Sequence, residues 1–248
     1  VVAFPTETVY GLGARIDSDV ALKKIFETKK RPFFDPLIVH VPNVEVAKSC
    51  YKKWNEIAEV LSKKFWPGPL TLVMQKSDHI SDVITSGLSS VGVRIPQHEI
   101  ALKLLNEVKV PLAAPSANLF GKTSPTQAQH VRSEFAGSVF VVDSSSCHIG
   151  IESTVLLVRE NQEISILRKG FITKTDIENE LLSHRILFKW VDIQDKKESP
   201  GHMKHHYMPE IPFVISKNHQ ITVQQLVEIV SQKIAQMPDE IDEKKKKK

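Results

Sequence analysis

The sequence predicts an α/β protein with a twisted sheet of mixed parallel and antiparallel strands and flanking helices. Two observations predict this fold class. Short apolar segments of strand type alternate with segments of helical periodicity over residues 1–183. The connections between the strands are of two kinds, because some are long enough to hold a helix and others are only short turns. Crossovers and hairpins in one chain imply a mixed sheet.

The first elements follow from helix capping and from apolar runs. Residues 1–5 predict a buried strand, and Asp17-Ser18 caps a helix that ends in the basic run 29–31. After it we expect a strand at 36–41, a helix over 43–65 and, beyond the Trp66-Pro67-Gly68-Pro69 break, a strand at 70–74.

The later elements continue the alternation. Ser124-Pro125-Thr126-Gln127 combines a cap, a proline and a reciprocal glutamine, and predicts a helix running to about residue 135. The other expected elements are strands at 90–95, 111–114, 139–142, 153–158 and 164–167 and helices at 97–107 and 173–183.

The composition changes after residue 183 and predicts four parts. Residues 1–183 form the main domain, and residues 184–210 form a linker that becomes polar and rich in Lys, His and Pro from residue 192. Residues 211–243 suggest part of a βα domain, with a strand at 211–215 and a helix at 222–236, and are too few to bury a core alone. Residues 244–248 are a lysine tail. The first residue is not Met, and we expect further sequence ahead of it.

Charge and cysteine content exclude several classes of protein. The formal net charge is +4, but five of the 33 basic residues belong to the tail, which leaves 28 against 29 acidic residues. A body without a broad basic face predicts at most a weak, local RNA contact. Cys50 and Cys147 lie far apart without a CxxC spacing, which argues against structural zinc and disulfides and favours the cytoplasm. No apolar run is long enough for a membrane span.

Candidate site residues are polar side chains at predicted strand ends, where α/β sheets gather ligands. The chain has no GxxxxGK[ST], GxGxxG, GxSxG or HExxH motif, which disfavours the common nucleotide-binding and hydrolase scaffolds. The hydroxyls and paired glycines of residues 5–13 suit close approach to a polar ligand, or a plain structural turn. The positive charges of Lys29 and Arg31 could bind a phosphate, or they could simply offset the dipole at the C-terminal end of a helix.

Arg94 is harder to explain structurally than the other candidates. A charge inside the apolar run VGVRIP needs a partner, and a ligand carboxylate or phosphate meets that need. His40 lies in an apolar strand, where a histidine is more often a hydrogen-bonded core residue than a ligand-binding one. Simple turn or strand roles also suit the remaining candidates, Ser116, Asn118, Ser153 and Thr154.

Taken together, six motifs in one order and spacing carry a resemblance to a known family. They are PTETVYGLG, KKRP followed by PLIVHV, WPGPLTL, VGVRIP, APSAN and STV. The chain closely resembles the threonylcarbamoyl-AMP synthase family, the YrdC-like proteins, over residues 1 to about 170. The segment from Ser199 to Pro209 further resembles the SPG…HYxP linker of the longer, two-domain form.

The resemblance implies an enzyme, an L-threonylcarbamoyladenylate synthase of the nucleotidyltransferase class with a YrdC-like fold. Such enzymes make threonylcarbamoyl-AMP and pyrophosphate from L-threonine, bicarbonate and ATP with Mg²⁺. A separate transferase complex then modifies the tRNA adenosine next to the anticodon. Because a carbamate oxygen attacks the α-phosphorus of ATP, the protein mainly has to position anions.

The resemblance also assigns roles to residues of this sequence. The threonine pocket comprises Thr8, His40, Arg94, Ala114, Ser153 and Thr154. The ATP site comprises Arg31, Asp35, Ser90, Ser116, Ser124, Arg168 and Tyr207, the last as a lid from the linker. The catalytic set is Lys29, Arg31, Ser116 and Asn118, and no metal ligand is assigned to the protein.

Three alternatives stay open. A carbamoyl-transfer domain of the YrdC-like type works from carbamoyl phosphate beside zinc-finger domains, and the lack of CxxC pairs counts against it. An RNA-binding module is disfavoured by the neutral body. His202, His205 and His206 have the residue type of a metal site, although linker histidines are usually solvated.

Overall fold

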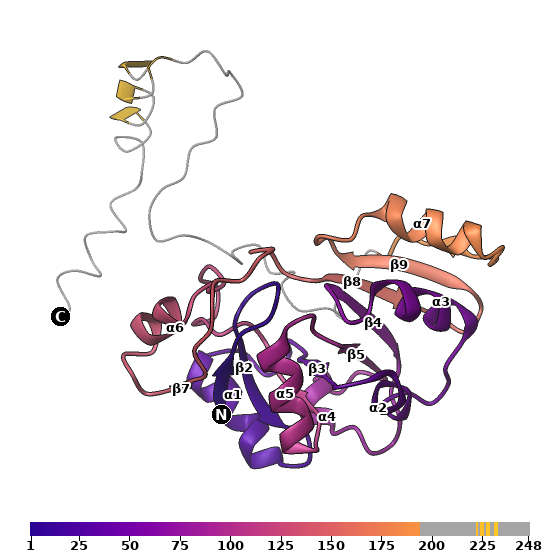
Figure 1. Ribbon diagram of the computed structural model, residues 1–248, viewed down its shortest axis with the longest axis horizontal. Helices are drawn as coiled ribbons and strands as arrows, with labels where there is room; N and C mark the ends of the chain where they lie inside the picture. Colours follow the sequence, from indigo (N-terminus) through magenta and orange to yellow (C-terminus); the bar gives the residue numbers. More distant parts are fainter. Residues whose placement is uncertain (194–221, 223, 226, 229–230, 233–248) are drawn as a thin grey trace. The chain divides into compact units, whose positions relative to one another are not determined.

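The computed structural model describes residues 1–193 and, farther along, residues 222, 224–225, 227–228 and 231–232. The chain divides into two compact units, Val1–Met208 and Pro209–Lys248. The first unit contains a ten-stranded sheet in the order β10-β9-β8-β4-β5-β3-β6-β2-β1-β7, with helices beside it (Figure 1).

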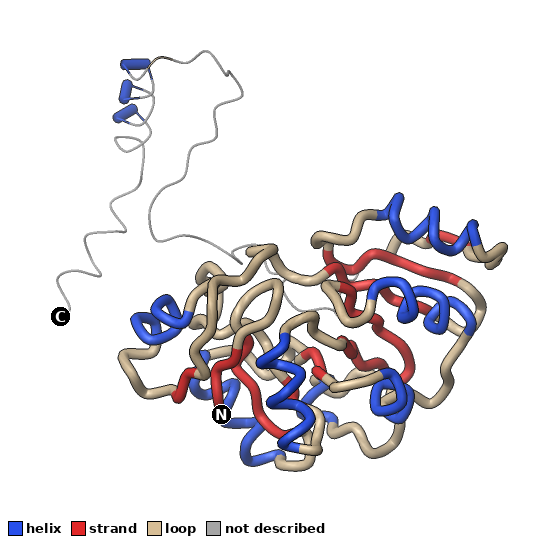
Figure 2. Tube along the Cα trace, viewed as in Figure 1, coloured by secondary structure: helices blue, strands red, loops and turns tan. Residues whose placement is uncertain are grey.

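The strands are short and come from all parts of the first unit. They are β1 (Val2–Phe4), β2 (Gly11–Arg15), β3 (Ile38–His40), β4 (Leu70–Gln75), β5 (Ser90–Arg94), β6 (Leu112–Ala113), β7 (Phe140–Val141), β8 (Thr154–Val158), β9 (Glu163–Arg168) and β10 (Lys189–Trp190). The helices are α1 (Asp19–Lys29), α2 (Val44–Ser49), α3 (Glu56–Phe65), α4 (Asp82–Thr85), α5 (Glu99–Val108), α6 (Ala128–Glu134) and α7 (Lys174–Ser183). Figure 2 shows how helix and strand alternate along the chain.

The pairing of the strands confirms the predicted fold class. Strands β3 and β5, β4 and β8, β1 and β7, and β9 and β10 are parallel. Strands β1 and β2, β2 and β6, β3 and β6, β4 and β5, and β8 and β9 are antiparallel. Because β3 and β5 run in the same direction with His40 opposite Arg94, these two polar residues end neighbouring strands at one edge of the sheet.

Local capping explains where two of the predicted helices begin. The Ser18 side chain accepts a hydrogen bond from the Ala21 N–H at the start of α1. Thr173 and Asp176 form a reciprocal capping box at the start of α7, which satisfies two backbone donors that a helix end leaves free. Helices α3 and α7 pack against each other near the β8–β9 hairpin (Figure 1).

The structure differs from the sequence-based expectations in five elements. The helix expected over 43–65 is two helices, because Asn55 caps a new one after a short irregular segment. The helix expected from residue 124 begins at Ala128, and its N-cap Gln127 makes no side-chain capping bond. Strands β2 and β10 and helix α4 were not expected. Strand β10 pairs with β9, so the sheet continues past residue 183, where the linker was expected to begin.

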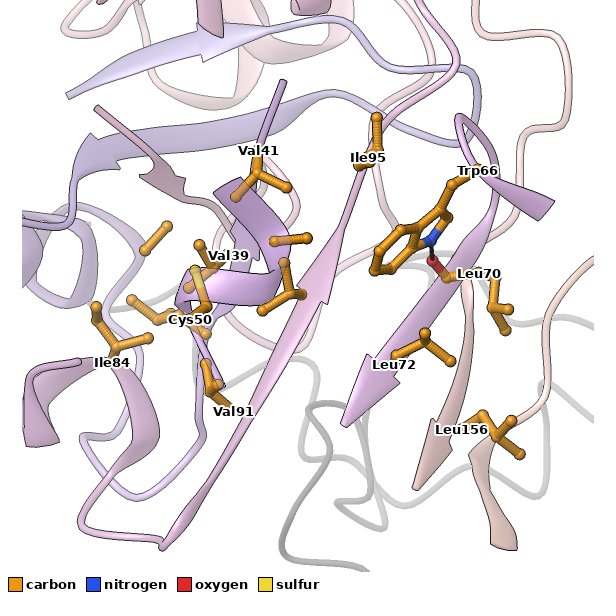
Figure 3. Close-up of a cluster of buried hydrophobic side chains, with 14 of the residues drawn as sticks. Val39, Val41, Cys50, Trp66, Leu70, Leu72, Ile84, Val91, Ile95 and Leu156 are labelled. Atoms are coloured by element: carbon orange, nitrogen blue, oxygen red, sulfur yellow. Dashed lines mark hydrogen bonds between the residues drawn. The ribbon is translucent and has the colours of Figure 1, made fainter. Parts of the chain in front are cut away.

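The core lies between the sheet and its helices. Figure 3 shows aliphatic side chains from β3, β4, β5 and β8 in one buried cluster, with Trp66 at one side of it near Ile95 and Leu70. The indole Nε1 of Trp66 donates to the Leu70 carbonyl oxygen at 2.7 Å, so the polar atom of this buried ring is satisfied. Among the described residues, no helix has both the length and the apolar composition required to cross a membrane.

The described residues of the second unit are few. Residues 224–225, 227–228 and 231–232 are helical, within the helix expected over 222–236. Thr222 and Gln225 make the reciprocal bonds of a helix N-terminus, since Gln225 N–H donates to Thr222 Oγ1 at 3.3 Å and Thr222 N–H donates to Gln225 Oε1 at 3.0 Å. The strand expected at 211–215, Tyr207, the three linker histidines and the lysine tail lie outside the described residues.

Candidate anion-binding site

A pocket opens at the edge of the sheet where β3, β5, β6 and β9 end and β2 and β8 begin. Segments far apart in the sequence meet there. The lining residues are Thr6, Thr8, Val9, Gly11, Arg31, Pro36, Ile38, His40, Arg94, Ala114, Pro115, Ser116, Glu152, Ser153 and Arg168. Eight of the residues predicted from the sequence are among them, namely Thr8, Arg31, His40, Arg94, Ala114, Ser116, Ser153 and Arg168.

Arg94 ends β5, and its guanidinium is held from several sides. Its Nε donates to the Gly68 carbonyl oxygen at 3.3 Å and its Nη1 donates to Thr8 Oγ1 at 2.9 Å. Its Nη2 lies 2.6 Å from Glu7 Oε1, and both side chains are 4% exposed. The sequence suggested a ligand as the partner of this buried charge. The structure instead supplies an internal carboxylate, on a residue that sequence reasoning missed.

The hydroxyls of Thr6 and Thr8 form a directed chain. Thr6 Oγ1 donates its one hydrogen to the Val9 carbonyl oxygen at 2.6 Å. The 2.9 Å bond between the two hydroxyls must therefore be donated by Thr8. Since Thr8 Oγ1 also accepts from Arg94, its hydrogen is used and only a lone pair remains for a ligand donor.

His40 is a neutral ring at the end of β3. Burial, and then the nearby positive charge of Arg94, lower its pKa to about 3. Its Nδ1 lies 3.2 Å from the Ile38 carbonyl oxygen, which can only accept, so Nδ1 carries the hydrogen. The other nitrogen, Nε2, is therefore the acceptor of the ring.

Lys29 is buried behind the pocket rather than in its lining. Its ammonium donates to the carbonyl oxygens of Ser116 and Asn118 and so ties the end of α1 to the loop after β6. Desolvation, followed by the positive charge of Arg31, lowers the pKa of Lys29 well below its usual value. The geometry gives Lys29 a positioning role for the loop that carries Ser116.

Asn118 also serves this loop. Its amide nitrogen donates to the carbonyl oxygens of Leu119 and Lys122 at 2.7 and 2.9 Å. The side chain is buried and does not line the pocket. The loop's own contribution to the pocket is Ser116 with its neighbours Ala114 and Pro115.

Arg31 lines the pocket, whereas Asp35 stands behind it. Arg31 Nη2 lies 2.9 Å from Asp35 Oδ2 and donates to the Pro36 carbonyl oxygen at 2.9 Å. Both side chains are buried. Asp35 was predicted to contact ATP, and in this structure it instead neutralises and orients the arginine.

The outer end of the pocket is formed by Ser116, Glu152 and Arg168, which are partly exposed. Arg168 donates from Nε to the Ser153 carbonyl oxygen at 3.1 Å and from Nη2 to Ser153 Oγ at 3.0 Å. Glu152 lies 3.6 Å from Arg168 and accepts from Ser124 Oγ at 2.7 Å. Ser124 thus reaches the site through Glu152.

Glycine at position 170 allows this arrangement. A Cβ there would lie 2.3 Å from the Thr154 nitrogen and 2.5 Å from the Glu152 carbonyl oxygen. Only a residue without a side chain lets the segment after β9 approach the start of β8 so closely. The contact holds Arg168 and Ser153 together at the outer end.

Two predicted residues lie apart from the pocket. Ser90 begins β5 and Arg94 ends it, which separates them by about 13 Å along an extended strand. Thr154 begins β8 beside the pocket, but its hydroxyl donates to the Ile172 carbonyl oxygen at 2.7 Å. The structure thus gives Ser90 and Thr154 no direct contact with this pocket.

The three arginines of the pocket share one feature, a carboxylate beside each. The pairs are Arg31 with Asp35, Arg94 with Glu7 and Arg168 with Glu152. Sequence reasoning missed Glu7, Glu152 and Thr6. Glu7 and Thr6 lie within the PTETVYGLG motif, so their place beside Thr8 was the available signal, whereas Glu152 had none beyond its position before the STV motif.

A pocket lined by three charge-balanced arginines, two of them at strand ends, is typical of proteins that bind small anionic molecules. The chain belongs to the Sua5/YciO/YrdC family, whose model, described as telomere recombination, matches residues 1–170. This membership confirms the resemblance that the sequence motifs indicated.

Two curated relatives bear the name threonylcarbamoyl-AMP synthase. The one from Pyrococcus abyssi is 43% identical over 233 residues, covering 92% of this chain and 67% of the relative. The one from Bacillus subtilis is 43% identical over 230 residues, covering 92% of this chain and 66% of the relative. A solved structure of P. abyssi Sua5 complexed with L-threonine matches with a TM-score of 0.75 and 46% identity, over 84% of this chain and 62% of that one. The chain therefore spans about two thirds of the length of these relatives.

Proposed function

We propose that this protein is an L-threonylcarbamoyladenylate synthase, which joins L-threonine, bicarbonate and ATP into threonylcarbamoyl-AMP and releases pyrophosphate. The observation that carries the proposal is the convergence of Arg31, Arg94 and Arg168 on one pocket. All the proposed substrates carry negative groups, and the chemistry needs those groups held close together. The names of the relatives and the threonine complex of P. abyssi Sua5 support the same assignment.

The buried end of the pocket suits the amino acid. Arg94 keeps one N–H on Nη1 for the threonine carboxylate, whereas its Nη2 is enclosed beside Glu7. Thr8 Oγ1 and His40 Nε2 are acceptors, as their other hydrogen bonds require. Acceptors suit a ligand that carries an amino group and a hydroxyl, and threonine brings both.

The remaining arginines suit the nucleotide phosphates. Arg31 and Arg168 line the same pocket as Arg94, and Ser116 is another of its lining residues. The donor set also fits a magnesium ion, because Mg²⁺ usually enters with the phosphates and takes one or two protein carboxylates. Glu152 lines the pocket and would be such a ligand, and the ion would offset the charge of the triphosphate. Among the described residues, no group of three or more His, Cys, Asp or Glu side chains is placed to hold a metal ion.

In this mechanism the chain binds and orients rather than reacting covalently. Threonine adds its amine to carbon dioxide or bicarbonate, and an oxygen of the carbamate attacks the α-phosphorus of ATP as pyrophosphate leaves. Arg94 fixes the amino acid, and Arg31 and Arg168 hold the phosphates in reach and stabilise the charge that develops on them. The loop held by Lys29 brings Ser116 to the same point.

The product is a labile mixed anhydride, and the proposal includes its protection and use. Tyr207 would cover the nucleotide as a lid and exclude water. A transferase complex in the cytoplasm would then pass the threonylcarbamoyl group to the tRNA adenosine next to the anticodon. If the lid proposal is right, Tyr207→Ala shortens the lifetime of threonylcarbamoyl-AMP in a single-turnover assay, and an unchanged lifetime removes the lid from the proposal.

The function is tested by mixing the protein with ATP, Mg²⁺ and bicarbonate, adding each amino acid in turn and measuring pyrophosphate. Release that depends on threonine and on bicarbonate supports the proposal. Release with carbamoyl phosphate in place of both would indicate the carbamoyl-transfer alternative. Tight RNA binding without any pyrophosphate release would indicate an RNA-binding module.

A further inference from the structure

Glu7 is a buried carboxylate that the proposed reaction leaves without a role. It is 3% exposed and lies directly behind Arg94, outside the lining of the pocket. Within the described part of the chain, neither of its carboxylate oxygens accepts a hydrogen bond. Its contact with Arg94 Nη2 at 2.6 Å is an ion pair in which no N–H bond points along the line to the oxygen.

Such an arrangement is unusual for a buried acid. Buried carboxylates normally accept several hydrogen bonds, and an exception calls for an explanation. Backbone contacts fix Glu7 here, because its carbonyl oxygen accepts from the Ile149 N–H at 2.9 Å and that of Thr8 accepts from the Gly150 N–H at 3.1 Å. The carboxylate is therefore held against the guanidinium by the loop, while the donors of Nη2 stay free of it.

The donors of Arg94 can be counted. Of its five N–H groups, one serves Gly68 and one serves Thr8. One N–H on Nη1 remains for a ligand carboxylate, whereas Nη2 is enclosed beside Glu7 with almost no accessible surface. A ligand carboxylate bound there would lie within a few ångströms of Glu7, and two negative charges at that separation repel strongly in a buried site.

We propose that Glu7 is a specificity-determining residue that makes the amino-acid end of the pocket select zwitterions over simple carboxylates. The pair of Glu7 and Arg94 has no net charge, so a ligand that brings only a carboxylate meets repulsion from Glu7. In a ligand with an ammonium group next to its carboxylate, the attraction between the ammonium group and Glu7 offsets that repulsion. The inference rests on the proposed function, because it takes Arg94 as the partner of the threonine carboxylate.

The test compares two ligands of similar shape on three variants of the full chain. L-Threonine and 3-hydroxybutanoate, which lacks the ammonium group, are titrated calorimetrically into wild type, Glu7→Gln and Glu7→Asp. Glu107→Gln on the exposed side of α5 is the matched control. The readout is the ratio of the two dissociation constants, since a purely structural loss weakens both ligands alike.

We expect Glu7→Gln to lower the preference for threonine over 3-hydroxybutanoate at least tenfold, mainly by tighter binding of 3-hydroxybutanoate. Glu7→Asp should keep most of the wild-type preference, and Glu107→Gln should keep all of it. An unchanged ratio in Glu7→Gln overturns the inference, whatever the absolute affinities. If wild type fails to bind threonine at all, the proposed function falls and this inference with it.

Discussion

The two ends of the pocket are built differently. At the inner end, Thr8, His40 and Arg94 are buried, and their hydrogen bonds run to neighbours in the loop after β1, in β3 and in the turn at Gly68. At the outer end, Ser116, Glu152 and Arg168 are partly exposed. The inner end is enclosed by the fold, whereas the outer end keeps a limited exposure within the described part of the chain, 10% for the Arg168 side chain and 17% for that of Glu152.

The difference indicates how the two ends recognise their ligands. Fixed, desolvated groups make electrostatic and hydrogen-bond differences between ligands count, because interactions are screened less inside a protein than in water. The outer end relies on charge that solvent and salt weaken. Under the proposed function, discrimination between amino acids belongs to the inner end, and phosphate positioning at the outer end needs several groups acting together.

The largest effect is expected from Arg31, which lines the pocket and pairs with Asp35. Arg31→Ala should lower threonine-dependent pyrophosphate formation at least 100-fold, because it removes a charge-assisted phosphate contact worth roughly 3 kcal/mol. Threonine affinity should change less than threefold, since Arg94 is untouched. Calorimetry for threonine and steady-state kinetics for ATP measure the two effects separately.

Arg15→Ala is the matched control, because Arg15 is exposed and pairs only locally with Asp17 among the described residues. It should retain full activity. Near-normal turnover in a folded Arg31→Ala protein would remove Arg31 from the phosphate site. A large loss of threonine affinity would show that the two ends are not independent.

The strands buried on both faces could be predicted from the sequence, because their apolar runs are continuous. Leu70–Gln75 and Thr154–Val158 are of this kind. Strand β2 could not, because Gly11 and Gly13 weaken the local preference for a strand. Its partners decide the outcome, since β1 and β6 pair with it on either side and a Cβ at Gly13 would lie 2.7 Å from the Phe4 ring.

The residues of the site also differ in whether the sequence alone could predict them. Arg94 was predictable, because a charge in an apolar strand signals a partner even when the partner is unknown. Glu7 was not, because its contact with Arg94 joins two distant parts of the chain. The resemblance to a family supplied Lys29 and Asn118 as catalytic residues, but only their contacts reveal that both hold a loop. The sequence pointed to eight of the residues that line the pocket, and only the packing shows what each of them touches.

The second prediction concerns the loop that joins the two ends. Lys29→Met should lower the free energy of unfolding by about 2 kcal/mol, because it leaves two buried carbonyl oxygens without their donor. Activity should fall through misplacement of Ser116, with ATP kinetics affected more than threonine affinity. Chemical denaturation and calorimetry measure the two consequences.

Lys24→Met is a close control, since Lys24 lies on the same helix but is exposed and paired with Glu27. It should change the free energy of unfolding by less than about 0.5 kcal/mol. Equal stability of the two variants would mean that Lys29 does not hold the loop, and the outer end would then have to be positioned by other contacts.

The last prediction tests whether water reaches the inner end. Because burial and Arg94 lower the folded-state pKa of His40 from 6.5 to about 3, the unfolded chain binds a proton at this residue between those values and the folded chain does not. Stability from this residue is present above about pH 6.5 and is lost as the pH falls, by about 1.4 kcal/mol per pH unit.

His40→Gln should remove this contribution to the pH dependence of the free energy of unfolding between pH 6 and 4. His79→Gln changes an exposed residue and should leave the pH dependence intact. Urea unfolding at several pH values measures how the free energy of unfolding of each protein changes with pH. If wild type and His40→Gln show the same change, water reaches the inner end. The contrast between the two ends is then weaker than their burial indicates.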